Sequence, residues 1–216
     1  MVSIRMVLNV TEYHADVYYN SHTGERAHAA FPDGVIDDVN YDGSIRAFLF
    51  LLNNDCCTSI DKSRAFLSDL TGGKLNISKG MISRLNREFA LKTEPERRSA
   101  YADMLLSPVM HTDCTNAREN GKSCQVYVCA TPDGKALYFA RENMHNHLLF
   151  LHDLRVPATN NEAARLLKNY KRKQAQAVTF RSFENIDYLC QCMSMLVLMR
   201  LEDPANIYDR VSRIFG

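Results

Sequence analysis

Residues 107–142 read SPVMHTDCTNARENGKSCQVYVCATPDGKALYFARE, and this stretch decides the fold. It contains three apolar, β-rich runs, SPVMHTD, SCQVYVCAT and KALYFARE, joined by ARENGK and PDGK. Asn120-Gly121 and Asp133-Gly134 are strong hairpin dipeptides, because both residues of such a turn tolerate positive φ. The stretch therefore predicts a three-stranded antiparallel meander.

Helical patterns precede the meander. From Gly43 onward, Ile45, Phe48, Leu49 and Leu52 recur at the spacing of a buried helix stripe. A further helix is expected over 94–106, with Pro95 near its start.

Residues 58–91 form the clearest local unit of this region. Thr58 with Asp61 resembles a capping box, and Gly72-Gly73 ends the first helix. A second helix starts at Ser78, with Ile77 and Ile82 at hydrophobic-staple positions and an inner face of Ile82, Leu85 and Phe89. The pair resembles a helix-turn-helix, although its turn is longer than usual, and many structural helical hairpins look the same.

Helical patterns also follow the meander, over 144–153, 160–170, 184–201 and 204–214. One face of the 184–201 helix is expected to hold Met193, Leu196, Val197 and Arg200, and methionine is expected there as core filler. Residues 1–42 carry weak strand or loop signals with turns at HTGE and FPDG. The chain is thus an α+β protein in three ranges: 1–42, a helical and possibly DNA-binding 43–106, and 107–216.

Residues 157–173, PATNNEAARLLKNYKRK, predict a helix capped by Asn160 or Asn161 that runs into a basic stretch. No acid follows Glu162 until Glu184. A face this basic suits a phosphate backbone, but an ordinary solvated helix has the same pattern.

Composition limits the other function classes. The net charge is +1, so a nucleic-acid partner has to be recognised by local patches. No apolar run reaches the roughly 20 residues of a membrane span, and no signal peptide is recognisable at the N-terminus. Seven cysteines, an odd number without a CxxC, favour reduced thiols and a cytoplasmic location over a structural zinc site. The histidines at 145, 147 and 152 are a weak candidate metal cluster.

Two segments resemble the insertion-sequence-66-type transposases. The run HLLFLHDLRVPATNNEAARLLKNYKRKQAQAVTFRSFEN is similar to the C-terminal part of their catalytic domain, and residues 107–142 are similar to their first-Asp segment, H-x-D followed by a polar turn and N-G. With the helical region upstream, the similarity covers roughly residues 35–216. It implies an RNase H-like domain whose three acids hold two Mg²⁺ or Mn²⁺ ions for strand transfer on transposon-end DNA.

The resemblance makes Asp113 the first metal-binding acid and puts Ala164 at the position of the catalytic Glu, in Ala163-Ala164-Arg165. The family's central section, with the second Asp, is missing after Arg141. An incomplete RNase H-like domain without catalysis is therefore expected, because Mg²⁺ requires hard oxygen ligands. Glu162 and Asp153 are the alternative acids. Glu162 is two residues, about 200° of helical rotation, away from Ala164 and is expected to stabilise the helix N-terminus instead.

Nine basic residues are candidate DNA contacts: Lys79, Arg84, Arg87, Arg165, Lys168, Lys171, Arg172, Lys173 and Arg181. Three hypotheses remain open: an inactive transposase derivative that binds DNA or a full-length transposase partner, an active enzyme with noncanonical acids, and a structural helical protein. The deletion also exposes an edge of the meander, which the C-terminal helices have to cover if the protein is not to self-associate or aggregate.

Overall fold

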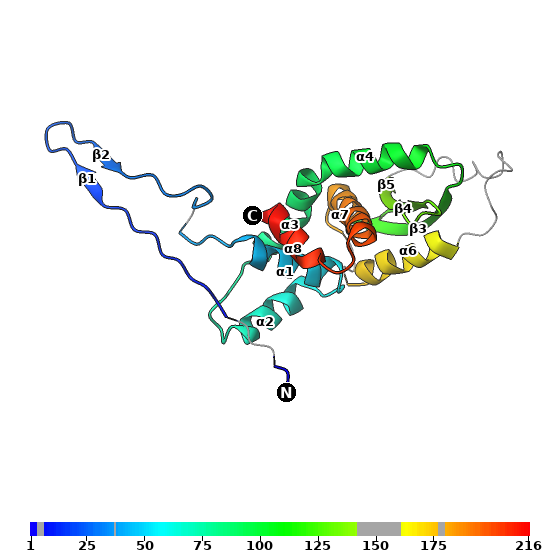
Figure 1. Cartoon of the computed structure of the whole chain (residues 1–216), viewed down its shortest axis with the longest axis horizontal. Coiled ribbons are helices and arrows are strands. Elements are labelled where there is room, and N and C mark those ends of the chain that lie inside the picture. Colours follow the sequence, from blue (N-terminus) through cyan, green and yellow to red (C-terminus); the bar gives the residue numbers. More distant parts are fainter. Residues whose placement is uncertain (4–6, 37, 142–160, 177–179) are drawn as a thin grey trace.

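The computed structural model describes residues 1–3, 7–36, 38–141, 161–176 and 180–216. It has an α+β fold in which N-terminal helices precede a three-stranded antiparallel sheet and C-terminal helices follow it (Figure 1). The elements are β1 Val17–Tyr19, β2 Arg26–His28, α1 Gly43–Asn54, α2 Ile60–Leu70, α3 Lys79–Lys92, α4 Glu94–Leu105, β3 His111–Glu119, β4 Lys122–Ala130, β5 Ala136–Arg141, α6 Asn161–Gln174, α7 Phe183–Glu202 and α8 Ile207–Phe215. None of the helices in the described ranges is long and apolar enough to cross a bilayer.

The predicted meander is confirmed, with strand order β3-β4-β5. Asn120 and Gly121 have φ of 45° and 84° and form a two-residue turn. The predicted bounds of the first strand are wrong, since β3 begins at His111 and includes the first half of the expected ARENGK turn. The tight turn pairs Glu119 of β3 with Lys122 of β4. From there the two strands pair without interruption as far as His111 and Ala130.

Local signals placed α3 correctly. Ser78 caps the helix by accepting a hydrogen bond from the N–H of Met81 at 3.1 Å. Ile77 and Ile82 are buried at the staple positions, and Leu85 and Phe89 are buried behind them. The predicted cap of α2 at Thr58 is wrong. Ser59 caps the helix by accepting a hydrogen bond from the N–H of Lys62.

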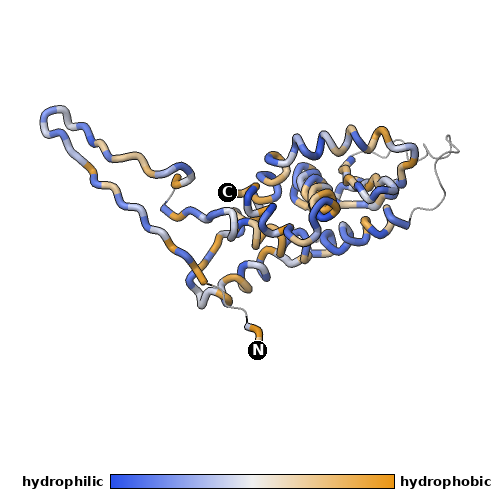
Figure 2. The backbone as a smooth tube through the Cα atoms, viewed as in Figure 1, coloured by the Kyte–Doolittle hydropathy of each residue, from blue (hydrophilic) through white to orange (hydrophobic). Residues whose placement is uncertain are grey.

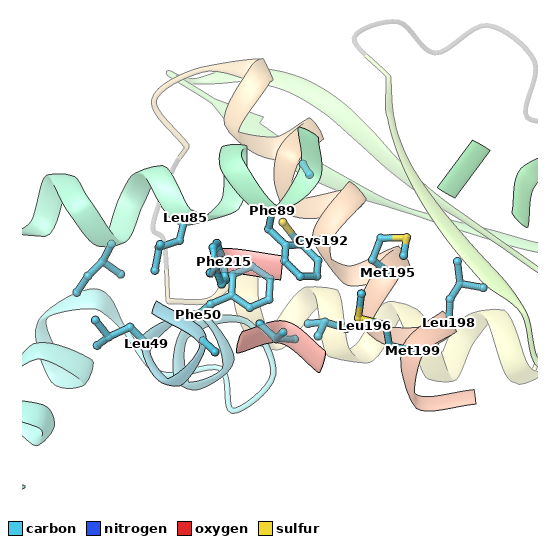
Figure 3. Packing of buried hydrophobic residues seen from close by; sticks show 14 of the residues in the cluster. Leu49, Phe50, Leu85, Phe89, Cys192, Met195, Leu196, Leu198, Met199 and Phe215 are labelled. Carbon is cyan, nitrogen blue, oxygen red and sulfur yellow. The ribbon is translucent and has the colours of Figure 1, made fainter. Parts of the chain in front are cut away.

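The expected stripe of α1 is only partly right. Leu49 is fully buried, but the other fully buried side chains are Ala47 and Phe50. The reason is that α1 packs against both α3 and α8, which centres its inner face on Phe50. The ring of Phe50 stacks on Phe89 with centroids 4.3 Å apart and meets Phe215 edge-on at 5.5 Å (Figure 3).

Two hydrophobic clusters build the interior. The first joins the N-terminal helices to the later part of the chain through Leu137 of β5, Met195 and Met199 of α7, and Phe215 of α8 (Figure 3). The methionines are therefore core residues, as predicted. The second cluster lies between the sheet and α6, where Val126 and Val128 pack against Leu166 and Leu167.

Neighbouring segments cover both outer edges of the sheet. On the β5 side, the backbone N–H of Tyr138 donates to the hydroxyl of Ser194 in α7. On the β3 side, Phe180 forms a parallel bridge with Glu119 and exchanges backbone hydrogen bonds with Arg118 and Asn120. The C-terminal region thus contacts both edges of the sheet, at Tyr138 of β5 and at the Arg118–Asn120 end of β3.

The hairpin of β1 and β2 extends away from the helical body (Figures 1 and 2). Its turn runs from Asn20 to Glu25, with Gly24 at φ 75°, as the HTGE signal predicts. Every residue of the two strands is exposed.

Candidate nucleic-acid interface

Helix α6 has an apolar inner face and a basic outer face. Ala163, Leu166, Leu167 and Tyr170 are buried against the sheet and α7. On the opposite side lie Lys168, Lys171 and Arg172, which are all exposed. These three residues, called the α6 basic row below, present positive charge over the last two turns of the helix.

Arg165 is exposed in the first half of α6, where its Nε donates to Glu162 at 3.0 Å. This hydrogen bond lowers the pKa of Glu162. Glu162 sits in the first turn of the helix, where a carboxylate is favourable, as the sequence predicts. The charge of Arg165 is thus partly compensated within its own helix.

The prediction that Lys173 contacts DNA is wrong, because this side chain is not on the surface. Its side chain is buried, with the residue 8% exposed, and Nζ donates to Oδ1 of Asn53 at 2.6 Å. Burial lowers the pKa of this amine to about 8. The helical period already contained the signal, because position 173 lies three residues after the buried Tyr170 and seven after Leu166.

Lys173 lies in a polar junction at the end of α1. Asn53 also donates to the carbonyl of Thr58 at 2.8 Å, and Asn54 donates to Oδ1 of Asn86 in α3 at the same distance. The last turn of α1 therefore contacts both helices that carry predicted DNA contacts, α3 and α6.

The candidates on α3 are only partly available to a ligand. Nζ of Lys79 is 2.7 Å from Oδ1 of Asp61 in an exposed ion pair. Arg84 and Arg87 are exposed, and Arg87 lies beside the hydroxyl of Tyr188. Arg181 is also exposed, next to the turn of Asn120, whose Nδ2 donates to the Arg181 carbonyl at 2.7 Å.

The structure adds Lys62 to the basic residues predicted from the sequence. A pocket between the start of α2 and the end of α6 is lined by Cys57, Thr58, Ser59, Lys62 and Gln176. The charges of Lys173 and Arg172 act on the Cys57 thiol, whose pKa is nevertheless raised because burial dominates. Lys62 therefore extends the positive region beyond α6, through a contact between segments more than 100 residues apart.

Asp113 lies half-buried on β3, on the sheet face that α6 covers. It pairs with Val128, which is buried against α6, and directly opposed residues share a face. One carboxylate oxygen of Asp113 accepts the N–H of Cys114 at 2.8 Å. Ala164 is half-buried on α6, close to the helix start, and His111 acts on the nearby Glu162.

The surroundings of Asp113 do not fit a two-metal site. Within the described ranges, no group of three His, Cys, Asp or Glu side chains could hold a metal ion. The methyl group of Ala164 offers no ligand oxygen. Several expectations lie outside the described residues: the helix over 144–153, the rescue by Asp153, the cap at Asn160 and the histidines at 145, 147 and 152.

The region can therefore attract an anionic polymer through exposed lysines and arginines. Its chemistry is electrostatic, because phosphate contacts need positive charge but no particular catalytic group. No protein-family model, curated protein or solved structure matches the chain.

Proposed function

We propose that this protein is a transposase-derived DNA-binding protein that has lost strand-transfer activity. The observation that carries the proposal is the α6 basic row, Lys168, Lys171 and Arg172, exposed on a helix whose other face is anchored in the core. A rigid helix that presents successive cations can follow a phosphate backbone.

The arrangement of the second half supports an incomplete RNase H-like domain. The meander begins with the strand that carries Asp113, and α6 packs across that strand. The parallel bridge at Phe180 occupies the outer edge of β3, where a further strand of a larger sheet could pair. These features agree with the resemblance over residues 35–216.

The loss of catalysis follows from the shortage of carboxylate ligands for metal ions. Two-metal phosphoryl transfer needs several carboxylates around the ions. Asp113 is the one acid for which the resemblance gives a matching position, and Ala164 stands where the family has Glu. Such a protein can act on transposition by occupying DNA ends or by associating with a full-length transposase.

The proposal is tested by measuring affinity for double-stranded DNA as a function of salt, with terminal-repeat and unrelated sequences. Replacing Lys168, Lys171 and Arg172 together with Ala should weaken binding at low salt. If all three contact phosphates, the slope of log K against log salt falls by about 2.7.

A control variant replaces three exposed basic residues elsewhere, Lys74, Arg98 and Arg213, and so removes the same charge. Loss of affinity in the first variant alone supports the α6 basic row. Equal losses in both variants indicate a general charge effect, and no binding by the unmodified protein at low salt favours the structural-protein hypothesis; either result overturns the proposal.

A further inference from the structure

The N-terminal arm, residues 7–36, carries apolar side chains that nothing in the single chain buries. Val17, Tyr18 and Tyr19 are consecutive in β1 and are 62%, 71% and 63% exposed. Successive strand residues point to opposite faces, so both faces of the hairpin are open. A two-stranded hairpin is marginally stable alone in water, so burial of these side chains against a partner would stabilise the arm.

The charge of the arm region identifies the chemistry of that partner. The arm, residues 7–36, contains one basic and four acidic residues, a net charge of −3. The rest of the chain contains 25 basic and 21 acidic residues, a net charge of +4. The net charge of the whole chain is close to zero because an acidic arm is attached to a basic body. Surfaces of opposite charge attract each other.

The α6 basic row is a body surface whose charge is complementary to that of the arm. It offers three exposed cations, and the arm offers carboxylates at Glu12 and Asp16 next to exposed tyrosine rings. Ammonium and guanidinium groups bind both carboxylates and the faces of aromatic rings.

We propose that the arm of one copy docks on the α6 basic row of a second copy. Figure 1 shows the arm extending from the side of the body opposite α6, so the chain does not cover its own row in this structure. A second copy carries both an arm and a row, so two copies can exchange arms around a two-fold axis and form two identical contacts.

One consequence rests on the proposed function. DNA and the acidic arm would compete for the same cations, so the dimer would be the form with lower affinity for DNA. The self-association itself does not depend on DNA binding.

Charge reversal in the full-length chain tests the proposal. One variant carries Glu12→Lys and Asp16→Lys, and the other carries Lys168→Glu and Lys171→Glu. Analytical ultracentrifugation at low salt should show a concentration-dependent dimer for the unmodified protein and at least about tenfold weaker association for each variant alone, because arm and row then repel each other.

Mixing the two variants makes both exchanged contacts complementary again. The mixture should form a heterodimer, and a chain that carries all four substitutions should again dimerise with itself. A monomeric unmodified protein overturns the proposal, as do variants that dimerise as the unmodified protein does and a mixture that stays monomeric.

The outcome is separable from that of the proposed function. The Glu12→Lys, Asp16→Lys variant keeps the α6 basic row and should bind DNA at least as tightly as the unmodified protein. If the row binds DNA but the mixed variants do not associate, arm exchange alone is wrong. If the variants associate as expected but no DNA binds, the proposed function alone is wrong.

Discussion

The backbone N–H of Tyr138 donates a hydrogen bond of 2.8 Å to the hydroxyl of Ser194, and both residues are buried. The serine in turn donates to the carbonyl of Cys190 at 2.8 Å. A serine inside an apolar helix thus takes the place of a neighbouring strand at the outer edge of β5. This contact gives the buried N–H of Tyr138 an acceptor where β5 has no further strand beside it.

Replacing Ser194 with Ala should lower the free energy of unfolding by about 1–3 kcal/mol, because the N–H of Tyr138 then stays buried without an acceptor. Urea unfolding monitored by circular dichroism measures the change. Ser83→Ala is the control, since Ser83 is an exposed helical serine that also donates to a backbone carbonyl. Equal effects of the two substitutions would show that Ser194 does not hold the sheet edge.

Gly43 and Gly80 form a matched pair for testing the packing of α1 against α8. A Cβ at Gly43 would overlap the carbonyl oxygen of Ser212, whereas a Cβ at Gly80 meets open space. Gly43→Ala should therefore destabilise the protein by about 1–3 kcal/mol, and Gly80→Ala should stabilise it by up to about 1 kcal/mol. Thermal unfolding of both variants checks the opposite signs, and a stabilised Gly43→Ala variant would contradict this helix contact.

The buried amine of Lys173 should make stability depend on pH above neutrality. Its pKa is about 8 in the folded protein and near 10.5 in the unfolded chain. The cost of burying the charge is fully present below pH 8 and is lost as pH rises from 8 to 10.5, so this contribution to stability increases over that range. The full change is about 3 kcal/mol.

Comparison with Lys173→Met isolates this contribution. Cys57 and Cys192, which act electrostatically on Lys173, have raised pKa values and contribute to the pH dependence in both proteins. The difference in unfolding free energy between the two proteins, measured in urea at several pH values, should shift in favour of the unmodified protein from pH 8 to 10.5. A constant difference would mean that the pKa of the amine is the same in the folded and unfolded states.

Ala164→Glu should not create strand-cleavage activity with Mg²⁺ or Mn²⁺. Under the proposed function, the substitution restores one acid of the implied triad, whereas no residue stands at the position of the second Asp. Cleavage of terminal-repeat DNA is measured for the unmodified protein, for Ala164→Glu, and for Ala164→Glu combined with Asp113→Ala. Activity in the single variant that disappears in the double variant would show that another acid replaces the second Asp.

Local signals were sufficient to predict the tight turn of the meander and the start of α3. Asn120 and Gly121 specify a tight turn through their tolerance of positive φ, and Ser78 starts α3 through its side-chain oxygen. Helical spacing likewise identified Leu85 and Phe89 as inner residues. These features depend on interactions within a few residues, which a sequence pattern contains directly.

The residues of the candidate interface were harder to predict from the sequence. Charge alone placed Lys173 with Lys171 and Arg172, although the helical period of α6 turns it inward against Asn53. No sequence pattern connects Lys62 with α6, because only folding brings the start of α2 next to Gln176.

The sequence by itself determined the order of helices and strands, the turns of the meander and the basic character of α6. Only the tertiary structure decided which of those cations remain exposed, how Ser194 and Phe180 cover the sheet edges, and that α1 turns Phe50 toward Phe89 and Phe215. The physical reason is the separation along the chain of the residues that interact. Turn and cap preferences act between neighbouring residues, whereas burial and edge coverage depend on surfaces that meet only when distant segments pack together.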